Sequence, residues 1–367
     1  MMPKKEVVST FQMHLLLYIG IISTGILTLP APLYYYAQQN MWLSLFIGSI
    51  AGYVIILINV FFYKTFPRKN ITEITTQLLG KFFGRLILLI MIALLIFQAV
   101  YTIKEYQIYL SVGFYQFTSP FVIIGFMMLV CAYASKKGIE VIGRSAQIIL
   151  PFMLLFYLSV SLLITPEVSL SNMLPVLEKG VMPPIKGAIL VAAWFSEFFW
   201  ISFCLTSLTG PPKKILKHGF LSVFLTTLSL LVFFVIDICV LGNYTGQTLY
   251  PTHLVERYIQ IGTFIERVSA FFMSVWVLGV FIKLAFLCFV IIQSSSQLFH
   301  ISNYRYLIIP IIMMIFFLSL SLFNSTQSLL VIGFPLLIIA CQIGNVFIPI
   351  TLFFIALLKV KMGKQQL

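Results

Sequence analysis

Long apolar runs alternate with short polar segments along the whole chain. The runs are 17 to 31 residues long. An α-helix that crosses a bilayer core about 30 Å thick needs roughly 20 such residues. The pattern therefore predicts a single all-α integral membrane domain over residues 1–367, built from ten transmembrane helices. These helices are predicted at 11–37, 42–63, 86–112, 118–134, 144–164, 186–209, 219–242, 264–294, 303–323 and 331–358.

The first apolar run contains an unusual segment at 23–32, which reads STGILTLPAP. Gly25 tolerates backbone angles that other residues avoid, and Pro30 lacks an N–H and clashes with the carbonyl four residues earlier. Freed backbone groups survive in a bilayer only where they line a cavity in the protein. The segment predicts either a ligand site, where N–H groups near Thr28 and Leu29 bind a carboxylate, or a simple proline kink. The ligand-site interpretation rests on Thr24, Gly25, Thr28, Leu29 and Pro30.

Composition supports the membrane assignment. The chain is 60% apolar and 9% charged, with mean hydropathy +1.06, whereas charged residues approach a quarter of an ordinary soluble domain. Its net charge is +13, and seventeen Lys and Arg fall on the side of the N-terminus against three on the other side. Because positive residues collect on the cytoplasmic side, both termini are predicted in the cytoplasm. This bias explains the charge through topology and contact with membrane lipid, and it removes nucleic acid as an expected partner.

The chain carries no motif typical of an enzyme or a metal protein. Its five cysteines fall inside apolar runs without a C-x-x-C pair, and its four histidines form no H-E-x-x-H pattern. The sequence also contains no phosphate-binding loop and no nucleophile elbow. We therefore expect no catalytic residues, no cofactor and no metal site.

The ten predicted spans divide into two sets of five, at about 11–164 and 186–358. Because five is odd, the second set must cross the membrane in the opposite sense, and the sixth span then corresponds to the first. An inverted repeat with interrupted helices and a midplane site is the architecture of many secondary transporters. The sixth span has no proline or glycine at its centre, although Ser196 lies there.

Glu197 lies about ten residues from the outer end of the sixth span, which is roughly 15 Å and near the bilayer midplane. A carboxylate there costs about 2.5 kcal/mol or more unless it is paired or hydrated. The residue is therefore predicted to bind the amine of a ligand, to act as a protonated switch, or to form a structural ion pair. Phe195, Ser196 and Phe198 beside it, and Tyr101 of the third span, are predicted to complete a substrate-binding pocket.

Four segments carry a resemblance to a known family. They are GILTLP at 25–30, ITEITTQLLGKFFGRL at 71–86, AYASKKGIEVIGRSAQIILPFMLL at 132–155 and NMLPVLEKGVMPPIKGA at 172–188. The chain resembles the B subunits of bacterial spore-germination nutrient receptors, in the spore permease branch of the amino acid–polyamine–organocation transporter superfamily. The resemblance implies a LeuT-like 5+5 inverted repeat with discontinuous helices 1 and 6. It also implies germinant sensing in the spore inner membrane, beside an A subunit and a lipoprotein C subunit.

Further charges lie within the predicted spans. Lys104 and Glu105 are adjacent, so they point about 100° apart on a helix and cannot simply pair, and the sequence leaves open which of them faces the interior. Asp237 lies near the outer end of the seventh span and is predicted as a hydrated interface residue. Lys283 in the eighth span either reaches the inner surface with its long side chain or takes the place of the cation that sodium-coupled relatives of this fold hold between spans 1 and 8.

These observations predict a membrane protein that binds a small molecule near the midplane. A free α-amino acid fits best, because its carboxylate would meet the freed N–H groups and its amine would meet Glu197. The preferred function is germinant sensing by a receptor subunit, and the alternative is a proton-coupled amino acid permease. A membrane enzyme and a purely structural partner are weaker alternatives. Only the resemblance separates sensing from transport.

Overall fold

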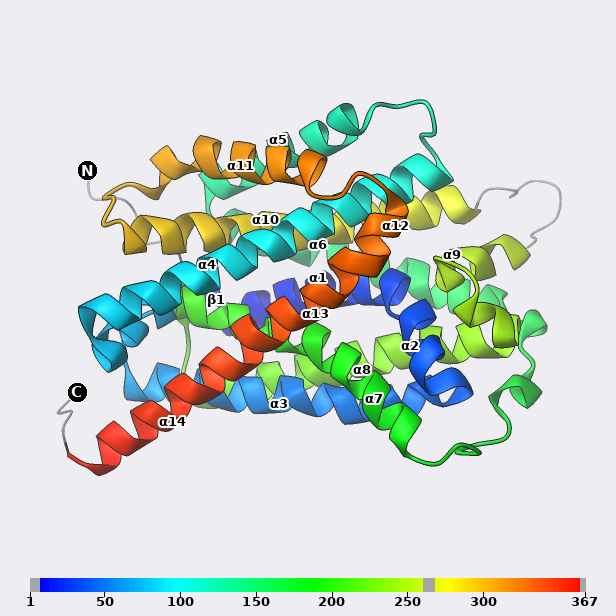
Figure 1. The fold of residues 1–367 in the computed structure, drawn as a ribbon, viewed down its shortest axis with the longest axis horizontal. Coiled ribbons are helices and arrows are strands. Elements are labelled where there is room, and N and C mark those ends of the chain that lie inside the picture. Colours follow the sequence, from blue (N-terminus) through cyan, green and yellow to red (C-terminus); the bar gives the residue numbers. More distant parts are fainter. Residues whose placement is uncertain (1–6, 260–267, 364–367) are drawn as a thin grey trace.

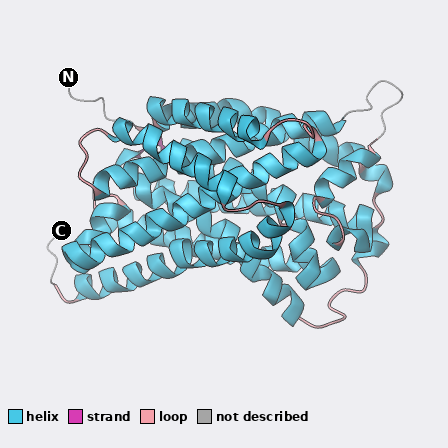
Figure 2. Ribbon diagram, turned by 45° about the horizontal axis from the view of Figure 1, so that its top comes forward, coloured by secondary structure: helices cyan, strands magenta, loops and turns pink. Residues whose placement is uncertain are grey.

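A computed structural model describes residues 7–259 and 268–363. Ten segments within these residues are long and apolar enough to cross a membrane, which confirms the predicted number of spans. Helices make up nearly all of the described chain (Figure 1, Figure 2). The one sheet among the described residues is a parallel pair of two-residue strands, β1 (Val8–Ser9) and β2 (Leu208–Thr209).

The spans follow one another in the predicted order. Span one consists of α1 (Thr10–Thr28) and α2 (Pro30–Ala37), and span six of α7 (Met182–Phe195) and the 3-10 helix η4 (Ser196–Ser207). Spans two to five and seven to nine contain α3 (Met41–Thr65), α4 (Ile71–Gly113), α5 (Pro120–Lys137), α6 (Ile139–Leu163), α8 (Pro212–Leu241), α10 (Val268–Leu298) and α11 (Ile308–Ser321). Span ten contains α12 (Thr326–Ser328), η8 (Leu329–Gly333), α13 (Phe334–Cys341), η9 (Gln342–Phe347) and α14 (Ile348–Lys361). The connections include α9 (Pro251–Val255) and the 3-10 turns η1 (Gln38–Asn40), η2 (Thr165–Glu167), η3 (Leu170–Met173), η5 (Gly242–Gly246), η6 (Glu256–Tyr258) and η7 (Tyr304–Leu307).

Several helices extend beyond their predicted bounds. The largest difference is at the third span, where α4 begins at Ile71 and not at residue 86. Asn70 and Glu73 cap this helix start, because each side chain accepts a hydrogen bond from the other's backbone N–H. Gly80, with φ 81°, then divides the short helix 71–79 from the span. Positions 264–267 of the predicted eighth span lie outside the described residues, as do Lys4, Lys5 and Lys364 of the charge count.

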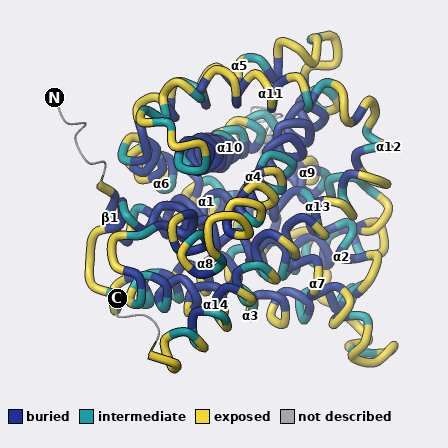
Figure 3. The backbone as a smooth tube through the Cα atoms, turned by 60° about the vertical axis from the view of Figure 1, so that its left-hand side comes forward, coloured by how far each residue is buried: buried dark blue, intermediate teal, exposed yellow. Residues whose placement is uncertain are grey.

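Burial separates a central group of helices from an outer group (Figure 3). Span six, α1 and α10 are mostly buried, whereas α5, α6 and α11 expose much of their surface. The outer helices expose apolar side chains such as Leu155 and Leu158 of α6, which are 67% and 63% exposed and suit contact with lipid. Polar groups on the three central elements are therefore enclosed by protein.

Span one is interrupted at Leu29, between α1 and α2. This residue keeps right-handed helical angles, and its N–H donates within the helix at 3.2 Å. The prediction that N–H groups near Thr28 and Leu29 are free to bind a carboxylate is therefore wrong. Pro30 has no N–H, so the carbonyl of Ile26 loses its helical partner. The hydroxyl of Thr252 on α9 donates to this carbonyl at 2.7 Å.

Span six is interrupted at its centre without a proline or glycine. The α-helical geometry ends at Phe195, and the narrower 3-10 helix continues from Ser196. The Ser196 hydroxyl donates to the carbonyl of Ala193 at 2.6 Å. The discontinuities predicted for spans one and six are both present, and both lie in the buried centre of the bundle.

The arrangement of the two bundle ends allows a test of membrane orientation. The two ends of the described chain, at β1 and at the end of α14, lie at one end of the bundle, and α2, α9 and α12 lie at the other (Figure 1). If positive residues mark the cytoplasm, single cysteines at Gln39, Thr248 and Ser325 should react with a membrane-impermeant thiol reagent outside intact cells. Cysteines at Lys137 and Lys213 should react only after the membrane is opened. Reaction of the Lys137 site in intact cells would overturn this orientation.

Candidate functional site

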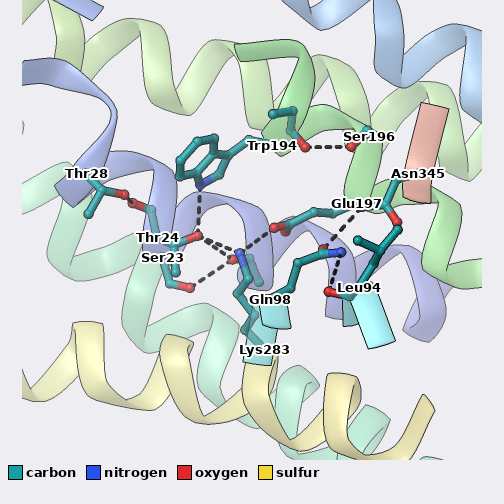
Figure 4. A network of polar contacts seen from close by, with 12 residues as sticks. Ser23, Thr24, Thr28, Leu94, Gln98, Trp194, Ser196, Glu197, Lys283 and Asn345 are labelled. Carbon is teal, nitrogen blue, oxygen red and sulfur yellow. Dashed lines mark hydrogen bonds and ion pairs between the residues drawn. The ribbon is translucent and has the colours of Figure 1, made fainter. Parts of the chain in front are cut away.

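A buried ion pair joins the two interrupted spans to α10. The ammonium of Lys283 on α10 lies 2.7 Å from Oε1 of Glu197 on η4 and 2.8 Å from the hydroxyl of Thr24 on α1 (Figure 4). The three residues are between 2% and 4% exposed. The ammonium also lies 5.7 Å from the centre of the Trp200 ring, whose face attracts a cation. Two charges that would each be costly in lipid thus compensate each other inside the protein.

This geometry bears directly on the two interpretations of Lys283. Its nitrogen is bonded to Glu197 and Thr24 in the protein interior, so it does not reach the membrane surface as the first interpretation supposed. The ammonium lies between α1 and α10, which are spans one and eight. That is the location that the cation-substitute hypothesis requires, and the functional role itself stays a prediction.

Thr24 connects the ion pair to further side chains of the interior. Its hydroxyl accepts a hydrogen bond from Nε1 of Trp194 at 3.1 Å as well as the one from Lys283. One turn along α1, the Thr28 hydroxyl donates to the Thr24 carbonyl at 2.6 Å. Trp276 of α10 donates to the neighbouring Ser23 carbonyl, also at 2.6 Å. Thr28 therefore extends the polar contacts from the ion pair toward the far end of α1.

The other residues predicted in spans one and six take part in helix packing. Phe195 and Phe198 are fully buried, and the Phe198 carbonyl accepts a hydrogen bond from the Asn59 amide of α3 at 2.9 Å. A Cβ added to Gly25 would lie 3.3 Å from Leu230 of α8, so this face of α1 packs against another helix. Ser196, Leu29 and Pro30 are also buried. The structure therefore brings Thr24, Glu197 and Lys283 together, but not the whole predicted set.

A cavity of about 750 Å³ lies beside the break in span one, among elements at the end of the bundle opposite the chain ends. Its walls come from the end of α1, from α2, α4, the segment 246–250 and span ten. Thr28 and Tyr101 are the two residues of the predicted site that line it. Of the adjacent Lys104 and Glu105, Glu105 lines the cavity, which answers the question that the sequence left open.

Glu105 is a buried acid without an evident partner. It is 3% exposed, and its Oε1 atom has no hydrogen-bond partner among the described residues. An unpaired buried polar group costs about 1–3 kcal/mol, and more when it is charged. Glu197, by contrast, is already compensated by Lys283 and does not line this cavity. The acid available to a ligand in the cavity is therefore Glu105.

Two paths of contact connect the cavity wall to the ion pair. Thr28 lines the cavity and hydrogen-bonds to Thr24, which contacts Lys283. Phe334 of α13 also lines the cavity, and its ring lies 6.0 Å from the ring of Trp194, which donates to Thr24. On either path, only one or two side chains separate a ligand in the cavity from Thr24.

Sequence reasoning missed several polar contacts. Asp237 is fully buried, and its Oδ2 lies 2.8 Å from the Thr252 hydroxyl, so the prediction of a hydrated interface residue is wrong. The physical reason is that α9 folds back over this end of span seven and excludes water. Gln98 of α4 and Asn345 of η9 bond to each other at 3.2 Å (Figure 4). Their polarity within apolar spans is the signal that could have identified them.

The segment formed by α9 and η6 covers the end of the bundle at which Asp237 lies. The Tyr109 hydroxyl of α4 lies 3.2 Å from Nδ1 of His253. Burial lowers the pKa of His253 to about 4, so its ring is neutral near pH 7. Burial also raises the pKa of the Glu256 carboxyl well above its ordinary value. The 3.5 Å approach of these two side chains is therefore not an ion pair at neutral pH.

The chain is similar in sequence to known spore germination proteins. The family model described as spore germination protein matches residues 7–328. Spore germination protein KB of Bacillus subtilis (strain 168) is 22% identical over 364 residues, which cover 98% of this chain and 96% of that protein. Spore germination protein XB of Bacillus anthracis is 28% identical over 292 residues, which cover 77% of this chain and 79% of that protein.

Two solved structures share the fold. Mhp1, a nucleobase-cation-symport-1 family transporter in a closed conformation with bromovinylhydantoin bound, has a TM-score of 0.70 at 12% identity, over 91% of this chain and 75% of that chain. A substrate-bound, outward-open Na⁺-coupled sialic acid symporter has a TM-score of 0.69 at 14% identity, over 92% and 79%. These similarities confirm the LeuT-like fold. The boundaries of the two five-span repeats stay a prediction.

Proposed function

This chain belongs to the family of spore germination proteins, and from that premise we propose that it senses a small-molecule germinant as one subunit of a spore germination receptor. The germinant class that we propose is the free α-amino acid. The observation that carries this proposal is the cavity of about 750 Å³ with the carboxyl group of Glu105 in its wall. An α-ammonium group would compensate this carboxylate with a charge-assisted hydrogen bond.

The proposed binding mode uses the residues that line the cavity. The ligand amine lies against Glu105, and the hydroxyl groups of Tyr101 and Tyr250 are donors for its carboxylate. These donors replace the backbone N–H groups that the helix break does not free. The aromatic rings also provide an apolar wall for the ligand side chain. A sugar or a nucleoside without an amine would leave Glu105 uncompensated.

We further propose that the pair of Lys283 and Glu197 responds to occupancy of the cavity. Thr28 contacts both the cavity and Thr24, so a ligand that moves Thr28 changes the surroundings of the ammonium. The ammonium also takes the place of a bound cation, and the response then requires no sodium. Under this proposal, Leu29 and Pro30 shape the break, Gly25 lets α1 pack closely on α8, and Phe195, Ser196 and Phe198 position Glu197.

Family membership and the charge bias together support a proposal for the membrane in which the protein lies and for its orientation there. We propose the spore inner membrane, with both termini in the cytoplasm, beside an A subunit and a lipoprotein C subunit. The relatives are named for germination, and the structural neighbours are transporters. We propose no enzymatic activity for this chain.

Deletion of the gene tests this function. Spores that lack it should stop responding to at least one amino acid in a panel of single amino acids, and the wild-type gene should restore the response. The same amino acid should raise the thermal unfolding temperature of the purified protein, because a ligand that binds only the folded state stabilises it. A normal response of the deletion spores to every amino acid would contradict the proposal.

A proton-coupled amino acid permease is the second candidate. The transporter fold and two buried acids, Glu105 of α4 and Glu197 of η4, favour it. Purified protein in proteoliposomes should then accumulate the radiolabelled amino acid when a proton gradient is imposed, and a protonophore should abolish the uptake. Binding without uptake supports the sensor, and uptake that follows the gradient supports the permease.

A further inference from the structure

A second hollow lies at the end of the bundle that holds both chain ends. An apolar groove of about 550 Å³ runs along α4 just after Gly80 and extends to the end of α10. Leu86 and Leu89 of α4 and Phe299, next to the end of α10, line this groove, and all three are exposed. Exposed apolar side chains on a spanning helix are suited to contact with acyl chains.

Two cations lie in the wall of this apolar groove. Lys81 and Arg85 both line it, and neither forms an ion pair within residues 7–259 and 268–363. Arg85 also lines an adjoining polar hollow of about 440 Å³, together with Thr76 and His300. An apolar hollow and a polar hollow therefore meet at the Arg85 guanidinium, which has no carboxylate partner among the described residues.

The guanidinium of Arg85 is held in place by His300. Its Nη2 lies 2.7 Å from Nε2 of His300. Because a guanidinium only donates, Nε2 is the acceptor and the ring proton lies on Nδ1, which is a further donor. His300 has φ 54°, which is uncommon for a residue other than glycine. Ser296 holds this turn, since its carbonyl accepts from the N–H of Ile301 at 2.9 Å and its hydroxyl donates to the Ile301 carbonyl at 2.7 Å.

We propose that this site binds one anionic phospholipid, with its phosphate at Lys81 and Arg85 and one acyl chain along Leu86 and Leu89. An anionic head joined to an apolar tail matches both hollows at once. From Lys81 to Leu89 the helix rises about 12 Å, which is most of the depth of one bilayer leaflet, about 15 Å. Basic pockets between helices are known to recognise such head groups. Glu73, an acid in the polar hollow, is engaged as the cap of α4.

Lipid titration of the purified full-length protein in neutral detergent tests the site. The probe is fluorescent phosphatidylglycerol, with fluorescent phosphatidylcholine as the neutral comparison. Each cation near an anionic lipid contributes about fivefold in affinity. The variant Lys81→Gln/Arg85→Gln should therefore bind phosphatidylglycerol about 25-fold more weakly, with little change for phosphatidylcholine. The single variant Lys81→Gln should bind phosphatidylglycerol about fivefold more weakly, and it changes only one exposed side chain.

The matched control is Lys213→Gln/Lys214→Gln. It removes two exposed lysines at the start of α8, so it makes the same change in net charge away from the groove. This control should keep the affinity of the wild type. Equal loss in both double variants would show general attraction to charge, and displacement of the probe by inorganic phosphate would show a free-phosphate site. Either result overturns the proposal, as does equal binding of the two lipids by the wild type.

Discussion

The Lys283→Ala variant should accumulate in the membrane at less than about a tenth of the wild-type amount. The substitution leaves Glu197 buried without its partner. Removal of one member of a buried ion pair typically costs about 3–5 kcal/mol, which is a large part of the 5–15 kcal/mol that stabilises most folded proteins. The measurement is the amount of protein in membrane fractions by immunoblot, together with thermal unfolding of the purified variant.

Two further variants and one condition separate stability from signalling. Lys186→Ala removes an exposed lysine and should behave as the wild type. Lys283→Met/Glu197→Leu removes both charges and should restore the protein amount, while the germinant response stays lost because the pair is proposed to respond to the ligand. The wild type should respond equally in sodium and potassium salts. If Lys283→Ala accumulates and responds normally, the ion pair is needed neither for the stability of the protein nor for its response to the germinant.

The Glu105→Gln variant should need about 10–100-fold more amino acid for a half-maximal germination response while it accumulates normally. The amide keeps the shape of the side chain and removes its charge. A hydrogen bond to a charged group contributes about 1.5–3 kcal/mol, and each 1.4 kcal/mol is tenfold in affinity. Unlike the Lys283 variant, this one leaves no buried ion-pair partner behind. Dose–response curves of spores with matched protein amounts provide the measurement.

Glu197→Gln distinguishes between the two acids. Its main expected effect is a lower protein amount, because Lys283 loses the charge that compensates it. The half-maximal concentration for the protein that remains should change much less than in Glu105→Gln. The reverse pattern, with a large shift for Glu197→Gln and none for Glu105→Gln, would assign the ligand amine to Glu197 and refute the role of Glu105.

The spans could be predicted because each one depends on a local property of the sequence. A stretch of about 20 apolar residues is more stable in lipid than in water, whatever the rest of the chain does. The start of the third span shows where this reasoning fails. Residues 71–79 are helical because Asn70 and Glu73 cap them and because one face packs on the bundle, and neither effect enters an average hydropathy. Hydropathy alone therefore does not predict a helix at 71–79.

The residues of the site were only partly predictable. Glu197 and Lys283 stand out because a charge in an apolar span is costly and needs an explanation. Their contact does not stand out, because the two residues are 86 positions apart in the chain. The expected free N–H groups were wrong for a local reason, since the chain keeps helical angles at Leu29 and proline frees a carbonyl and not an N–H.

The sequence by itself determined the number of spans, the interruption of span one and the presence of ionisable groups in the interior of the bundle. Only the tertiary structure decided that Glu105 faces the cavity, that Lys283 compensates Glu197, and that α9 covers Asp237. The physical reason is that lipid and the neighbouring helices are almost equally apolar. A spanning helix therefore carries little periodic signal of which face meets protein. Its rotation is settled by packing and hydrogen bonds with spans that lie far away in the sequence.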